Sequence, residues 1–394
     1  MKVGIVVSPD FFTNHVGVRN YVSSLHALLS KEARVDYLTC QATPSNRRQW
    51  HILQPPSLRL AADNFVAKSH LIEGSPLQAY HSYRKCADAP TPTLPTIPRL
   101  ALGASLDCER YDVLLISAPW CVDFTERLPA PRVVGLAYDT IPNTIGFTTS
   151  DIRPFQLAGE HSNGYRYFRE HCDLTLAISP DTAESLAALF SIPKQKIIAL
   201  PPFLPAGYHG RVLSDVPRGR NLVLASPFDP RKGLSTIPAI VNATAHSLEK
   251  LFIYGKPRCH PDLVRTFFTD LDAKINVVWY LHATADAIVT LFSASRLLLF
   301  PSRQEGLGLP VLEAQLCGAR VAARPISPIR ENLLHGAVQL GDSPAENAER
   351  VAAVIADSTF DHTGLARHAA ERFSVASVRA ALTPLLAPSI RRAA

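Results

Sequence analysis

The sequence predicts an α/β protein with two Rossmann-like domains that face each other across a cleft. Three observations predict it: the length of the chain, an alternation of strand and helix patterns, and a proline-rich break near the middle. A chain of 394 residues exceeds one ordinary hydrophobic core. Hydrophobic residues make up 47% and charged residues 19% of the sequence, a globular composition that fits neither a disordered nor a membrane chain.

Short β-branched or leucine-rich runs alternate with amphipathic stretches in the N-terminal half, the pattern of parallel strands covered by helices. Residues 54–100 interrupt this pattern with closely spaced prolines, which cannot occupy a central strand or a helix interior, so we expect an insertion there. Helices are expected at 17–30 and 180–190. Strands are expected at 3–7, 35–38, 113–117, 133–137, 174–178 and 196–200.

A second alternation follows a proline- and glycine-rich stretch at 201–219, which is typical of an interdomain linker. We therefore expect an N-terminal domain at 1–205, a C-terminal domain at 218–375, and a terminal helix at 376–394 that could pack back on the first domain. In open α/β sheets, ligands bind at the carboxyl ends of the strands. Strands are expected at 222–225, 251–254, 277–280, 297–300, 320–323 and 338–340.

Composition and motifs exclude several classes of protein. No apolar run approaches the roughly 18 residues that cross a bilayer, and no basic-aromatic array indicates nucleic-acid binding. The 7 cysteines form no C-x-x-C pair, which disfavours a disulfide framework and a structural zinc site, so we expect a cytoplasmic protein. No metal is expected either, because Asp270 and Asp272 end a helical pattern, where residues two apart do not face each other.

The loop after the strand at 297–300 predicts an anion site. Its glycines let a backbone approach a ligand closely, and Pro310 favours the first position of a helix, whose free N–H groups attract negative charge. Glu305 then lies in the loop and Glu313 on the opening helical turn, where carboxylates can accept hydrogen bonds from the vicinal hydroxyls of sugars. On these residues alone, an acidic first turn that only complements the helix dipole is the more favoured interpretation.

A second candidate element follows the first strand of the C-terminal domain. Arg231 and Lys232 lie at a strand-to-helix turn, where they could neutralise a diphosphate leaving group. Basic pairs at helix starts are usually only solvated. The interpretation gains weight because this turn and the loop around Glu305 belong to the same edge of one predicted sheet.

The run from Phe300 to Ala314, with Glu305 and Glu313 in an E-x7-E pattern, resembles the signature of retaining GT-B glycosyltransferases of family 4. Further matches are Pro230-Arg231-Lys232-Gly233, Tyr254-Gly255, Leu281, and the segments 318–321, 326–331 and 335–342; the N-terminal half resembles the family more loosely, at 177–182. The resemblance implies the GT-B fold, with residues 1–205 on the acceptor side and residues 218–375 on the donor side.

The resemblance also implies roles for individual residues. Glu313 would bind the nucleotide ribose, Glu305 the transferred sugar, and Lys232 the diphosphate, with Arg231 assisting. Tyr138 and Asp139 would approach the sugar as orienting groups from the N-terminal domain, and Gly17 would lie near the diphosphate in the turn after the first strand. The remaining donor contacts are expected from Gly306, Leu307, Gly308 and Leu309 to sugar and phosphate, and from Tyr254, Gly255 and Leu281 near the nucleobase.

The implied activity is transfer of a sugar, with retention, from a nucleoside diphosphate sugar to an acceptor hydroxyl, without a metal or another cofactor. The acceptor would be a glycan or a lipid-linked molecule, as in the synthesis of bacterial surface polysaccharide. Such a role allows for peripheral contact with the inner face of the membrane.

Three positions differ from the family pattern. Ser226-Pro227 stand where the family usually has Gly-Arg, Tyr138 where it has histidine, and Val16 where it has a glycine. Two other functions therefore stay open. A GT-B-fold sugar-nucleotide epimerase would share the nucleotide pocket and release a changed sugar without an acceptor, and a non-catalytic nucleotide-sugar-binding protein would bind the donor without turnover.

Overall fold

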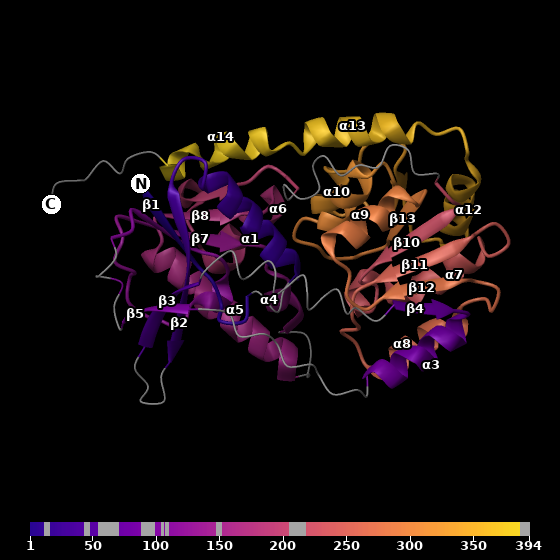
Figure 1. Cartoon of the computed structure of the whole chain (residues 1–394), viewed down its shortest axis with the longest axis horizontal. Helices are drawn as coiled ribbons and strands as arrows, with labels where there is room; N and C mark the ends of the chain where they lie inside the picture. The colour runs from indigo at the N-terminus through magenta and orange to yellow at the C-terminus, as the bar shows by residue number, and fades with distance from the viewer. Residues whose placement is uncertain are drawn as a thin grey trace. The chain divides into compact units, whose positions relative to one another are not determined.

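The chain forms two compact units in a computed structural model (Figure 1). Unit 1 comprises Met1–Ala62, Pro95–Ala206 and Ser374–Ala394, and unit 2 comprises Asp63–Leu94 and Gly207–Phe373. The structure describes residues 1–11, 16–42, 48–53, 71–87, 99–103, 106, 110–146, 152–204 and 218–386. Within these ranges, no helix is both long enough and apolar enough to cross a membrane.

The described part of unit 1 is built on one sheet with the order β5-β3-β2-β1-β6-β7-β8-β9. Its strands are β1 (Lys2–Val6), β2 (Arg34–Ala42), β3 (Arg48–Leu53), β5 (Arg99–Gly103), β6 (Val113–Ile116), β7 (Arg132–Ala137), β8 (Leu174–Ala177) and β9 (Ile197–Ala199). The central strands are parallel. β3 and β5 extend the sheet beyond β2 by antiparallel pairing, which the sequence does not predict. The helical elements are α1 (Val16–Leu29), η1 (Pro119–Cys121), α4 (Ile141–Gly146), α5 (Ile152–His171), α6 (Pro180–Phe190), η2 (Lys194–Lys196) and α14 (Val375–Leu386).

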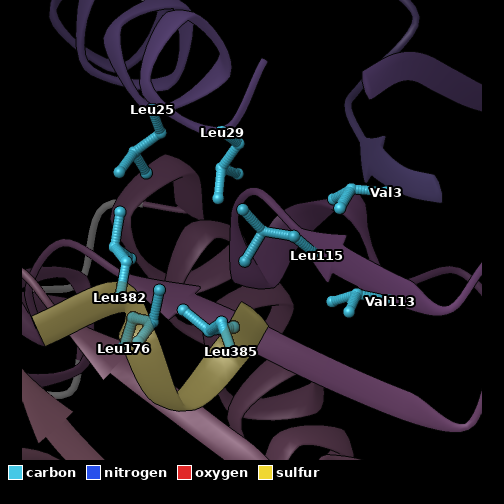
Figure 2. A pocket seen from close by; sticks show the side chains of 8 residues that line it. All are labelled: Val3, Leu25, Leu29, Val113, Leu115, Leu176, Leu382 and Leu385. Carbon is cyan, nitrogen blue, oxygen red and sulfur yellow. The ribbon is translucent and has the colours of Figure 1, made fainter. Parts of the chain in front are cut away.

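The C-terminal helix α14 docks on the sheet of unit 1. Leu382 and Leu385 lie beside Leu176 and close an apolar pocket between α1, the central strands and α14 (Figure 2). The guanidinium of Arg132 donates hydrogen bonds to the carbonyls of Pro384 and Leu385, the latter at 3.0 Å, which satisfies carbonyls at the end of the helix. The helix ends at Leu386, and the rest of the predicted helix 376–394 lies outside the described residues.

Unit 2 contains a doubly wound sheet with the order β15-β14-β13-β10-β11-β12-β4. Its parallel strands are β10 (Asn221–Ala225), β11 (Lys250–Tyr254), β12 (Val277–Tyr280), β13 (Leu297–Phe300), β14 (Arg320–Ala323) and β15 (Val338–Gln339). The chain adds β11 and β12 on one side of β10, and β13, β14 and β15 on the other side. This unit therefore has the Rossmann strand order, with its switch point between β10 and β13. The helical elements are η3 (Pro230–Lys232), η4 (Leu234–Thr236), α7 (Ile237–Asn242), α8 (Pro261–Asp270), α9 (Ala285–Ser293), α10 (Leu309–Leu316), α11 (Ser327–Arg330), α12 (Pro344–Ala356) and α13 (His362–Arg372).

Residues 71–87 correct the predicted domain boundaries. The prediction places the whole of 54–100 in the N-terminal domain, but β4 (Leu71–Gly74) pairs antiparallel with β12 at the edge of the unit 2 sheet, and α3 (Pro76–Ala87) lies against α8 (Figure 1). Ile72 and Ala79 are buried in the core of unit 2. The prediction was wrong because the free edge of β12 and the apolar surface beside it are tertiary features, which no local pattern of residues 71–87 encodes.

Candidate functional site

The loops after β10 and β13 leave the two strands at the switch point and pack closely together. Gly233 closes η3 with φ +73°, and a Cβ atom at this position would lie 2.5 Å from the carbonyl oxygen of Pro301 in the other loop. A backbone hydrogen bond of 2.9 Å from Arg303 to the carbonyl of Arg231 joins the loops as well. Only glycine permits both the left-handed backbone and this approach at position 233.

A buried cluster of charges lies between these loops. The ammonium of Lys232 donates a short hydrogen bond to Oε1 of Glu305, and the Lys232 and Glu305 side chains are only 11% and 9% exposed. The Arg231 guanidinium lies 3.5 Å from the same oxygen and also pairs with Asp229 at 3.1 Å. Ser302 donates to Glu305 Oε1 at 2.5 Å, and the Lys232 ammonium lies 4.6 Å above the Phe300 ring. Two cations thus converge on one carboxylate at the carboxyl edge of the sheet.

The ionisation of the cluster follows from this geometry. Burial alone would raise the pKa of Glu305, but the charges of Lys232 and Arg231 and the hydrogen bonds from Lys232 and Ser302 outweigh it and hold the pKa below its usual value. Burial lowers the pKa of Lys232, opposed by Glu305. The Glu305 carboxylate therefore stays ionised, and its negative charge balances the positive charge of the buried Lys232 ammonium.

The start of α10 lies directly after this cluster. Gly308 is the N-cap with φ +78°, a left-handed conformation that favours glycine, and a Cβ atom there would also displace Cδ1 of Ile329, 2.1 Å away. The helix begins at Leu309, one residue before the predicted start at Pro310, and Leu307 is buried beside it. Glu313 is also buried, on the first turns of α10. The segment forms the loop and helix start that the sequence predicts.

The ends of β11 and β12 carry the other predicted donor residues. Burial raises the pKa of Tyr254 well above its usual value, and the Glu313 carboxylate raises it further, so the phenol stays neutral beside that carboxylate. The carbonyl of Gly255 accepts a hydrogen bond of 3.0 Å from the indole of Trp279, which is fully buried. Leu281 is buried directly after β12. Unit 2 therefore brings Tyr254 next to Glu313 and fixes the neighbouring turn.

Three predicted residues belong to unit 1. Tyr138 is buried at the end of β7, and its hydroxyl has no hydrogen-bond partner among the described residues. The Asp139 carboxylate accepts a hydrogen bond of 3.0 Å from the amide of Ile141, and its carbonyl accepts one of 2.5 Å from the Tyr165 hydroxyl. Gly17 is exposed on the first turn of α1, which begins at Val16, one residue before the helix start expected from the sequence.

The region that holds the charged cluster is similar to known glycosyltransferases. Residues 220–357 match the family model of Glycosyl transferases group 1. The serotype-specific mannosyltransferase WbdA of Escherichia coli is 24% identical over 214 residues, which are 46% of this chain and 25% of WbdA. The chain thus covers about a quarter of the length of this relative.

Solved structures of glycosyltransferases resemble the whole chain. Sucrose-phosphate synthase from Thermosynechococcus elongatus has a TM-score of 0.59 at 16% identity and matches over 98% of each chain. WaaG, a glycosyltransferase involved in lipopolysaccharide biosynthesis, has a TM-score of 0.54 at 13% identity and matches over 98% of this chain and 100% of its own. The fold is GT-B. This confirms the fold class that the sequence predicts.

Ser226 stands where the family pattern usually has glycine, and its backbone conformation is one that glycine favours. Ser226 has φ +47°, a left-handed backbone conformation that residues other than glycine rarely adopt. Ser226 therefore has a backbone conformation that glycine would adopt without strain. Pro227 removes the arginine of the pattern, while Arg231 supplies a guanidinium in the same loop, where it contacts Glu305 and Asp229.

Several residues of the site were not singled out from the sequence. Ser302 lies in the quoted loop, and Asp229 orients Arg231 by accepting hydrogen bonds from its backbone amide and side chain at 3.1 Å each. Trp279 carries no local signal, because its role depends on the packing of β12 beside β11. In the described parts of the chain, no group of three or more histidine, cysteine or acidic side chains could hold a metal ion.

Proposed function

We propose that this protein is a glycosyltransferase that moves a sugar, with retention, from a nucleoside diphosphate sugar to an acceptor hydroxyl, without a metal. The observation that carries the proposal is the pairing of Lys232 and Arg231 with Glu305 at the switch point of unit 2, beside the start of α10. A diphosphate would take over the contacts of the two cations, and Glu305 would then accept hydrogen bonds from hydroxyls of the transferred sugar.

The chemistry depends on stabilising the leaving group. The bond between the anomeric carbon and the diphosphate breaks, the acceptor oxygen bonds to the same face of that carbon, and the leaving diphosphate accepts the hydroxyl proton. Lys232, Arg231 and the amides at the start of α10 act on the negative charge that develops on the diphosphate. Retention rests on the family resemblance, and so do the orienting roles of Tyr138 and Asp139.

Nucleotide recognition is assigned to Glu313 and its surroundings. The buried Glu313 carboxylate would accept hydrogen bonds from the vicinal hydroxyls of ribose, and the turn at Tyr254-Gly255 together with Leu281 would hold the base. Backbone contacts to the sugar and phosphates are assigned to Gly306, Leu307 and Gly308 of the loop and to Leu309, the first residue of α10.

The test is a thermal-shift panel of UDP-, GDP-, ADP- and dTDP-sugars on the wild type, Glu313→Ala and Glu346→Ala. Glu346 lies exposed on the first turn of α12 in the same unit, so its variant controls for the loss of a helical glutamate. We expect one class of nucleotide to stabilise the wild type and Glu346→Ala but not Glu313→Ala. A panel without any stabilising nucleotide, or an unaffected Glu313→Ala, contradicts the proposal.

The same panel, followed by product analysis, separates the other functions. An epimerase would release a free epimerised sugar when no acceptor is present, and a binding protein would be stabilised by donor without hydrolysis or transfer to any acceptor fraction. The acceptor is proposed to be a bacterial surface glycan or a lipid-linked precursor, reached at the cytoplasmic face of the membrane. The names of WbdA and WaaG, a mannosyltransferase and a lipopolysaccharide enzyme, support this choice.

A further inference from the structure

Trp120 lies at the topological switch point of unit 1. β1 and β6 are neighbours at the centre of the sheet, and the chain leaves them toward opposite sides, to β2 and to β7. Trp120 is in η1, the first element after β6. In open parallel α/β sheets, the crevice at such a point is where ligands bind. None of the proposed donor roles uses Trp120 itself.

The indole of Trp120 is held by two aromatic neighbours. Its ring lies 5.1 Å from the ring of His161 on α5 at an interplanar angle of 30°, and 6.1 Å from the ring of Tyr138 at 28°. Gly164 permits this arrangement, because a Cβ atom there would lie 2.2 Å from the carbonyl oxygen of Pro119. α5 therefore approaches η1 closely enough to place His161 against the indole.

Trp120 differs from the other two tryptophans of the chain in its exposure. Trp50 and Trp279 are 5% and 0% exposed, whereas Trp120 is partly exposed at the carboxyl edge of the sheet. A polar group lies close by, because the side chain of Asp139, the residue after Tyr138, is only partly buried. A flat apolar ring beside a carboxylate, which accepts hydrogen bonds from hydroxyls, is suited to a sugar.

We propose that Trp120 stacks against a pyranose ring of the acceptor, next to Asp139. A pyranose has an apolar face of C–H groups, which is complementary to the electron-rich face of an indole, and hydroxyls around its edge that a carboxylate can accept. The inference rests on the proposed glycosyl transfer and specifies its acceptor as a sugar ring at this position. A lipid phosphate or an acyclic polyol would have no such face.

The first experiment is a fluorescence titration of the full chain with methyl pyranosides of glucose, galactose, mannose and N-acetylglucosamine. Sorbitol is the matched probe, because it carries hydroxyls but no ring. We expect millimolar pyranoside to change the tryptophan emission of the wild type and of Trp50→Phe, to leave Trp120→Phe unchanged, and sorbitol to have no effect. An equal response to sorbitol, or no response to any pyranoside, overturns the proposal.

The second experiment separates acceptor from donor kinetically. In Trp120→Ala we expect the KM for a pyranoside acceptor to rise about tenfold, with partial recovery in Trp120→Phe, while the KM for the donor changes less than about twofold. A rise confined to the donor KM overturns the proposal, because Trp120 would then contact the nucleotide sugar. The proposed function fails by a different result, the absence of any stabilising nucleotide in the thermal-shift panel.

Discussion

Removing one charge of the Lys232–Glu305 pair is expected to destabilise unit 2 more than removing both. Each side chain is about a tenth exposed, so the single variants Glu305→Gln and Lys232→Met leave a buried charge with fewer partners. Glu305→Gln keeps an acceptor for the ammonium but leaves two cations, Lys232 and Arg231, side by side. Lys232→Met leaves a carboxylate that still contacts Arg231 at 3.5 Å and Ser302 at 2.5 Å.

These contacts set the loss in the free energy of unfolding that we expect for each variant. Breaking a buried ion pair costs about 3 to 5 kcal/mol. Glu305→Gln should lie in this range because the remaining carboxylate, Asp229, pairs with Arg231 and not with Lys232. Lys232→Met should cost about 2 to 3 kcal/mol, because Arg231 and Ser302 still stabilise Glu305. The double variant Lys232→Met/Glu305→Gln buries no charge and should cost about 1 to 2 kcal/mol. The coupling energy between the two positions is then about 3 kcal/mol or more.

The assay is urea unfolding of the four proteins in a Trp50→Phe/Trp120→Phe background. Trp279 is then the single tryptophan, and since it is buried in unit 2 its emission reports the unfolding of that unit. Single-variant losses that add up to the loss of the double variant within about 0.5 kcal/mol would refute the reasoning, because independent positions behave in that way. A smaller loss for Glu305→Gln than for Lys232→Met would contradict the role assigned to Arg231 and Ser302.

The pH dependence provides a control for the same variants. The pKa of Glu305 is lowered in the folded protein, so its contribution to stability is fully present above the unfolded value of about 4.3 and is lost as the pH falls through the folded pKa. The stability difference between the wild type and Glu305→Gln should therefore shrink below about pH 4. A difference that is constant into the acid range would mean that ionisation of Glu305 does not cause it.

Three further predictions concern single positions. Trp279→Phe removes the 3.0 Å hydrogen bond to Gly255, so the affinity for the stabilising nucleotide, measured by calorimetry, should fall about tenfold. An unchanged affinity would mean that the indole only fills the core. Leu385→Ala removes apolar contact between α14 and the sheet, so the free energy of unfolding of unit 1, measured by urea unfolding, should fall by about 2 to 5 kcal/mol. A smaller loss would show that the pocket collapses around the alanine. Ser226→Gly should stabilise unit 2 by up to about 1 kcal/mol, since glycine tolerates φ +47°, and a lower melting temperature would contradict this.

The elements that the sequence predicted share a local signal. The parallel strands of unit 2 are short apolar runs bounded by loop residues, so β10 to β15 were placed within about two residues. α6 was placed at its observed bounds because Ser179 caps it, with a hydrogen bond of 3.1 Å from the amide of Thr182, and Pro180 begins it. By contrast, β3, β4 and β5 add to sheet edges by antiparallel pairing, which depends on a neighbouring strand distant in sequence.

The candidate site shows the same division between local and tertiary information. Residues 305–313 and 231–232 were identified from loop chemistry and from resemblance, and each group was assigned a separate contact to the donor. Their mutual pairing was not predicted, because it depends on β10 lying beside β13 in the sheet. Once the Rossmann strand order is known, the pairing follows, since these strands flank the switch point and their following loops meet there.

The β4–α3 segment connects the N-terminal half of the sequence with the loops of the proposed donor site. Tyr83 of α3 packs against Trp279, with ring centroids 4.9 Å apart, and Trp279 in turn contacts Phe228 at 4.9 Å and donates to Gly255. Phe228 precedes the turn that carries Arg231 and Lys232. A substitution in α3 is therefore expected to shift both the loop with Arg231 and Lys232 and the turn at Gly255, because the buried Trp279 ring supports both. This is the physical reason to regard residues 71–87 as part of the unit that holds the proposed donor site.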